Sequence, residues 1–100
     1  MAKRSRPPIV RALQQLYADA QVETLRDRDW HSMTFSGRQL VLRIDLAGSD
    51  AMRRAEKLSA ELPEIEFALA RGFVAEIAVM KCEPTNTGAM LEIETLILDS

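Results

Sequence analysis

The chain has 100 residues, of which 47% are apolar and 28% charged, with a net charge of −2 at pH 7 and one cysteine. This length is typical of one domain with a core of modest size. A single cysteine excludes a small scaffold held by internal disulfides. No run approaches the roughly eighteen apolar residues of a membrane span, and the basic start lacks the apolar stretch of a signal peptide. We therefore expect a soluble cytoplasmic protein.

The first segment predicts a flexible basic arm at residues 1–6, followed by a helix. The arm has nothing apolar to bury, whereas Pro7-Pro8 suits the first turn of a helix. An apolar stripe then follows at helical spacing to about residue 19, formed by Ile9, Leu13, Leu16, Tyr17 and Ala20. Residues 22–28 show no clear period, and both a continued helix and an extended segment fit them.

A β-hairpin and a second helix are predicted next. Residues 30–35 form the first strand, Ser36-Gly37-Arg38 the turn, and the alternating run from Leu40 to Leu46 the second strand. A cap at Ser49 or Asp50 opens the helix, and Pro63 ends it. Its apolar stripe consists of Ala51, Ala55, Leu58 and Leu62.

Three further strands are predicted at residues 64–69, 73–82 and 90–98 from their alternation of apolar and polar residues. Most connections are too short for parallel crossovers, which favours antiparallel pairing. The predicted class is α+β: a predominantly antiparallel five-stranded sheet with two helices on one face, in the order α-β-β-α-β-β-β. A single domain then spans residues 7–100, and no internal repeat is apparent.

The second face of this sheet gives the leading functional hypothesis. The apolar content exceeds what one helix-covered face needs, so a second copy of the chain is expected to cover the other face, or a small ligand to be enclosed there. A solvated face with scattered aliphatic residues is the alternative. The candidate residues are Val41, Arg43, Asp45, Val74, Glu76, Met80, Glu92 and Glu94.

The charge distribution supports a second hypothesis. Residues 1–54 carry a net charge of +4 and residues 55–100 a net charge of −6. We expect the two halves to neutralise each other when they fold side by side. The alternative is a nucleic-acid-binding accessory protein that uses the arginine-rich arm, although the acidic balance of the chain disfavours phosphate. Its candidate contacts are Lys3, Arg4, Arg6, Arg26, Arg28 and Arg38.

A small enzyme ranks third. His31 and Cys82 have no neighbours at metal-ligand or nucleophile spacing. Acidic pairs occur within the predicted strands and before them, and ordinary solvent-facing alternation explains them. No catalytic residue, metal or cofactor is assigned. The sequence favours a non-enzymatic binding or assembly domain that self-associates as a homodimer.

Overall fold

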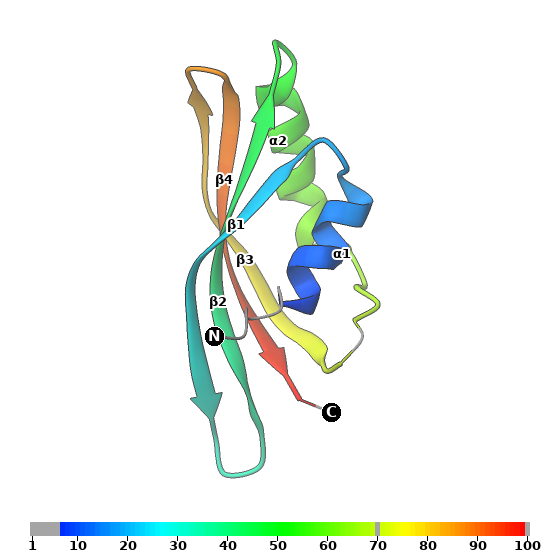
Figure 1. The fold of residues 1–100 in the computed structure, drawn as a ribbon, viewed down its shortest axis with the longest axis vertical. Helices are drawn as coiled ribbons and strands as arrows, with labels where there is room; N and C mark the ends of the chain where they lie inside the picture. Colours follow the sequence, from blue (N-terminus) through cyan, green and yellow to red (C-terminus); the bar gives the residue numbers. More distant parts are fainter. Residues whose placement is uncertain (1–6, 70, 100) are drawn as a thin grey trace, which may run out of the picture.

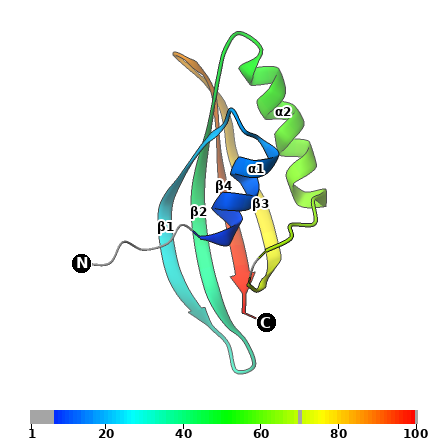
Figure 2. The same ribbon diagram turned by 45° about the vertical axis from the view of Figure 1, so that its right-hand side comes forward.

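The computed structural model describes residues 7–69 and 71–99, which form two helices, one 3₁₀ turn and four strands. The strands are all antiparallel, in the order β1-β2-β4-β3. Both helices lie against the same face of the sheet (Figures 1 and 2). The α+β class is confirmed, but the prediction of five strands is wrong. The elements are α1 (Pro8–Leu16), β1 (Gln21–His31), β2 (Ser36–Ala47), α2 (Ala51–Glu61), η1 (Leu62–Glu64), β3 (Phe73–Thr85) and β4 (Gly88–Leu98).

The strand that does not form is the one predicted at residues 64–69. The chain beyond η1 has no strand partner from residue 65 to residue 69. Ile65, Phe67 and Leu69 are half-buried and pack against the core, while Glu66 between them is exposed. A chain that covers a core on one side alternates with the period of a strand. The alternation therefore indicates one-sided burial here, without strand pairing.

The first hairpin is longer than predicted, and its turn lies elsewhere. Residues 22–28 are extended within β1, and the turn occupies residues 32–35 instead of 36–38. The Ser32 N–H donates to the Phe35 carbonyl oxygen at 2.8 Å, and the Phe35 N–H donates to the Ser32 hydroxyl at 3.0 Å. β1 is an edge strand with a bulge at Leu25. A bulge interrupts the alternation of faces, which explains the missing period in this segment.

The core lies between the helices and the apolar side of the central strands. The predicted apolar face of β2, from Leu40 to Leu46, is at most 4% exposed. The predicted stripe of α2 and Leu62 is buried as well. α1 ends earlier than predicted because the Tyr17 backbone leaves the helical region (φ −129°, ψ 76°). Leu16 is therefore 55% exposed, although the stripe placed it in the core.

The fold consists of two α-β-β halves related by an approximate two-fold axis between β2 and β4. Gly37 and Gly88 occupy equivalent positions at the starts of these strands, since each pairs with the end of the other strand. The bulge at Leu25 in β1 likewise corresponds to the bulge at Met80 in β3. The structure thus contains a repeat that the sequence does not make apparent.

Candidate functional site

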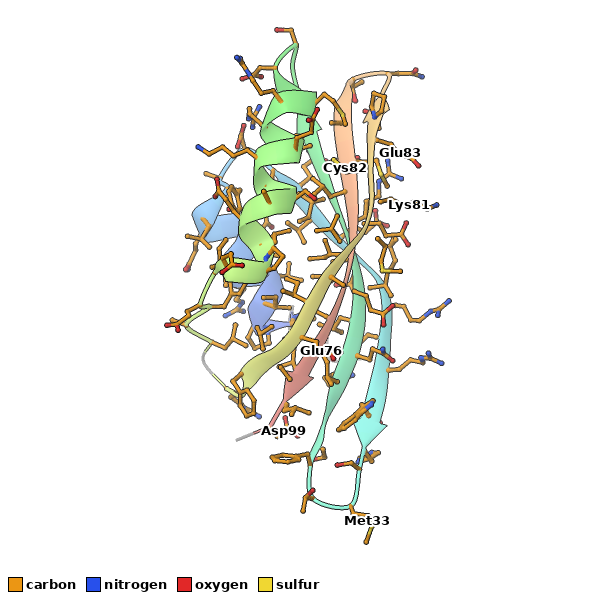
Figure 3. The ribbon with its side chains drawn as sticks, turned by 180° about the vertical axis from the view of Figure 1, so that it is seen from behind. Met33, Glu76, Lys81, Cys82, Glu83 and Asp99 are labelled. Atoms are coloured by element: carbon orange, nitrogen blue, oxygen red, sulfur yellow. The ribbon has the colours of Figure 1, made fainter. Side chains whose placement is uncertain are left out.

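The candidate site is the sheet face opposite the helices, which no other element covers within residues 7–69 and 71–99. We call it the open face; Figure 3 shows Lys81 and Glu83 on it, pointing away from α2. The strand registers arrange it in five cross-strand rows. In the order β1, β2, β4, β3, the first row is Gln21, Asp45, Met90 and Glu83; the second Glu23, Arg43, Glu92 and Lys81; the third Arg26, Val41, Glu94 and Ala78; the fourth Arg28, Gln39, Leu96 and Glu76; the fifth Trp30, Gly37, Leu98 and Phe73.

Charges alternate in sign across the second row, from Glu23 at one edge to Lys81 at the other. At its centre the Nε atom of Arg43 lies 3.0 Å from Oδ2 of Asp45. The hydrogen bond to Asp45 and its charge, together with the charges of Glu23 and Glu92, raise the pKa of the Arg43 guanidinium. This end of the open face therefore balances its charges within the chain.

The other end of the open face is more apolar. Trp30 and Leu96 are half-buried, and Phe73 is 45% exposed. Arg28 and Glu76 lie at the two edges of the fourth row, and both are exposed. Neither of them has an ion-pair partner in the part of the chain that the structure describes. An apolar centre is thus flanked by a positive edge on β1 and a negative edge on β3.

Most of the residues predicted for this surface do come together on it. The exception is Val74, which packs against the core on the helix side of β3. A bulge between Val74 and Glu76 shifts the strand by one residue, and such a shift moves a side chain to the other face. The open face or its border carries Val41, Arg43, Asp45, Glu76, Met80, Glu92 and Glu94.

The fifth row contains aromatic residues that the sequence placed elsewhere. Phe73 was expected in the core, and Trp30 was expected at a contact between helix and sheet. Both lie on the open face, because the turn at residues 32–35 sets Trp30 opposite Gly37 and the register sets Phe73 opposite Leu98. Correct placement of the turn is the sequence signal that could have located Trp30.

The arginines predicted to contact nucleic acid do not gather on one surface. Arg26 and Arg28 lie on the open face, whereas Arg38 lies on the helix side. There its Nε atom is 2.7 Å from Oδ1 of Asp27, and Asp29 is also within ion-pair distance. The remaining candidates, Lys3, Arg4 and Arg6, lie outside the described residues, as does the whole predicted arm.

His31 and Cys82 lie at opposite ends of the sheet. His31 ends β1 beside the turn that carries Met33, while Cys82 lies near the β3–β4 turn (Figure 3). A nucleophilic pair of these two residues is therefore excluded by distance. Within the described ranges, no three His, Cys, Asp or Glu side chains are grouped as metal ligands.

Cys82 provides a test of the packing on the helix side. Burial raises the pKa of its thiol, and the charge of Glu56 raises it further. We expect the alkylation rate of the native protein to reach half its maximum at a higher pH than in the urea-unfolded chain, where the same thiol titrates near about 8.5. The thiol form also favours folding, so this contribution is full below the ordinary thiol pKa and lost as pH rises through the raised value. A native midpoint at or below the unfolded one would contradict this burial.

An open hollow of about 810 Å³ borders β3 and the segment at residues 63–67. Its lining includes Ile65 and Phe67 on one side and Glu76 and Glu94 on the other. The charged groups that line it are all acidic, and no histidine, cysteine, lysine or arginine is among them. The hollow therefore offers a mixed apolar and acidic surface without a nucleophile or a cationic anchor.

No helix in the described part of the chain is long and apolar enough to cross a membrane. Comparison with protein-family models, with curated proteins and with solved structures finds no match to this chain.

Proposed function

We propose that the protein is a non-enzymatic assembly module that forms a homodimer through its open face. The observation that carries the proposal is the layout of the five rows. Apolar side chains fill the centre near Leu96, positive side chains line the β1 edge, and negative side chains line the β3 side. A surface with opposite charges at its two edges is complementary to a copy of itself.

Burial of the apolar part of the open face supplies the driving force. Leu25 and Met80, in the two equivalent bulges, are 47% and 57% exposed, and Phe73 is also largely uncovered. Removing such surface from water contributes about 25 cal/mol per Å². The spacing of four strands and five rows gives a projected area on the order of 600 Å². This approaches the roughly 800 Å² that each partner contributes to a standard interface.

The sheet edges are poorly suited to assembly, which leaves the face. β1 has a bulge at Leu25, and β3 has bulges at Ala75 and Met80. β3 also contains Pro84, which has no N–H to donate to an added strand. Bulges, charges and prolines at sheet edges discourage edge-to-edge pairing.

Sedimentation velocity over a concentration series tests the proposal. We expect wild type to shift from 11.2 kDa toward twice that mass as concentration rises. Leu96→Lys should raise the dimer Kd by about 100-fold, because the interface would then bury an added charge on each copy. In the monomer the lysine lies beside Glu76 on the adjacent strand, so the variant is expected to fold.

Met33→Lys is the matched control, because Met33 is fully exposed at the tip of the first hairpin, away from the rows (Figure 3). It should leave the dimer Kd unchanged. A wild-type mass of 11.2 kDa at every concentration would refute the proposal, as would equal effects of the two lysine substitutions.

A further inference from the structure

We infer that the two copies pack face to face with their strands aligned, about a two-fold axis that runs parallel to the strands over the junction of β2 and β4. This geometry rests on the proposed homodimer and specifies how the second copy binds. The axis exchanges the edges of the sheet, so β1 of one copy lies over β3 of the other. Each row then faces the same row of the second copy.

The charges of the open face match in this arrangement. In the fourth row Arg28 faces Glu76 of the second copy, and in the second row Glu23 faces Lys81 of the second copy. Arg43 likewise faces Glu92 across the axis. The two-fold symmetry makes each of these pairs twice, and no row places two like charges opposite each other. In the fifth row Trp30 faces Phe73 of the second copy, which suits an aromatic contact.

The other face-to-face arrangement has its two-fold axis perpendicular to the strands. Each strand then faces its own copy and the order of the rows is reversed about the third row. Arg26 would face Arg26, and Glu94 would face Glu94 at the centre of the contact. Like charges opposed across an interface disfavour that arrangement strongly. Sheets in sandwiches pack about 30° from parallel, which keeps neighbouring rows within reach of each other.

The edge charges are not satisfied within one chain. Arg28 and Glu76 belong to the same row, but two strands separate them, a distance of about 14 Å from strand spacing. This exceeds the screening length of about 8 Å at physiological salt. Moreover, every ion pair within the described ranges joins residues of the same half of the chain, either within 1–54 or within 55–100. The +4 and −6 halves are thus available for a second copy.

A charge-reversal cycle tests the geometry. Arg28→Glu and Glu76→Arg should each raise the dimer Kd by about tenfold, because each places like charges opposite each other at two symmetric sites. The double variant should return to within about threefold of wild type, since the pair is then restored with reversed signs. Arg53→Glu, on the exposed side of α2, changes the charge equally and should leave the Kd near that of wild type. A double variant that dimerises as weakly as the product of the single effects would overturn the aligned arrangement.

Cross-linking in a Cys82→Ala background gives a second, independent readout. A short bis-maleimide should join Arg28→Cys to Glu76→Cys when the two proteins are mixed, and should not join two copies of Arg26→Cys. Cross-linking of Arg26→Cys alone would overturn this geometry while leaving the homodimer intact. A wild-type protein that stays monomeric would instead overturn the homodimer itself, so the two failures are distinguishable.

Discussion

Gly37→Ala and Gly88→Ala should each lower the free energy of unfolding by about 2–4 kcal/mol, although neither glycine has a positive φ. The reason is a close approach of two backbones. A Cβ atom added at Gly37 would overlap the carbonyl oxygen of Ile97, and one added at Gly88 would overlap that of Leu46. Backbone atoms cannot rotate away as a side chain can, so β2 and β4 would have to separate at both ends.

Gly48→Ala is the matched control. Gly48 has a φ of 108°, which disfavours any side chain, but an added Cβ comes no nearer than 3.4 Å to Asp50 Oδ1. This substitution should cost only about 1 kcal/mol. Urea denaturation at a protein concentration below the dimer Kd compares the three variants. The two-fold relation predicts similar losses at Gly37 and Gly88, and a loss at either one no greater than at Gly48 would contradict the overlap.

Leu42→Ala should have a comparably large effect on stability, about 3–5 kcal/mol. Leu42 is fully buried between the sheet and the helices, opposite Ile93 on β4. Truncation leaves a cavity that neither the helices nor the sheet can close, so the lost contacts are not replaced. This loss should be the same at every protein concentration, because the side chain lies within one copy. Urea denaturation of wild type and variant at two concentrations provides the measurement.

Leu96→Ala is the counterpart on the open face. Leu96 is only half-buried, so truncation should cost about 1 kcal/mol or less at low protein concentration. The cost should rise with concentration, because dimerisation stabilises the folded state by mass action and the variant dimerises less well. A cost for Leu96→Ala that stays constant across the dimerisation range would contradict burial of this face by a second copy.

The helix-covered half of the molecule could be predicted because its sequence signals are local and periodic. The alternation from Leu40 to Leu46 identifies a strand with one buried face, and the stripe ending at Leu62 identifies a helix. Each of these elements is buried on one side only, so the apolar pattern and the actual burial agree. Pro63 marked the end of the helical region correctly within a single 3₁₀ turn.

The features that escaped prediction depend on partners distant in sequence. Bulges at Leu25, Ala75 and Met80 change which side chains face the helices, and nothing in the local sequence marks them. For this reason Val74 was placed on the wrong face. The segment at residues 65–69 alternates like a strand, and only the finished sheet shows that no partner strand is beside it.

The charge layout was visible in the sequence only as two halves of opposite sign. The strand order places Arg26 and Arg28 at one edge of the sheet and Glu76 at the other. The expected neutralisation between the halves is not made by ion pairs within the described ranges. The separation of charge across the open face is therefore a product of topology, and it is the feature from which the dimer geometry follows.

The most direct test of the homodimer is an isotope-filtered NOE experiment on a mixture of labelled and unlabelled protein, which detects contacts between copies only. We expect intermolecular NOEs from the methyl groups of Val41 and Leu96 on the open face. Leu16, exposed at the end of α1 on the helix side, serves as an internal control and should give none. Intermolecular NOEs from Leu16 in place of Val41 and Leu96, or none from any methyl group at millimolar concentration, would contradict dimerisation through the open face.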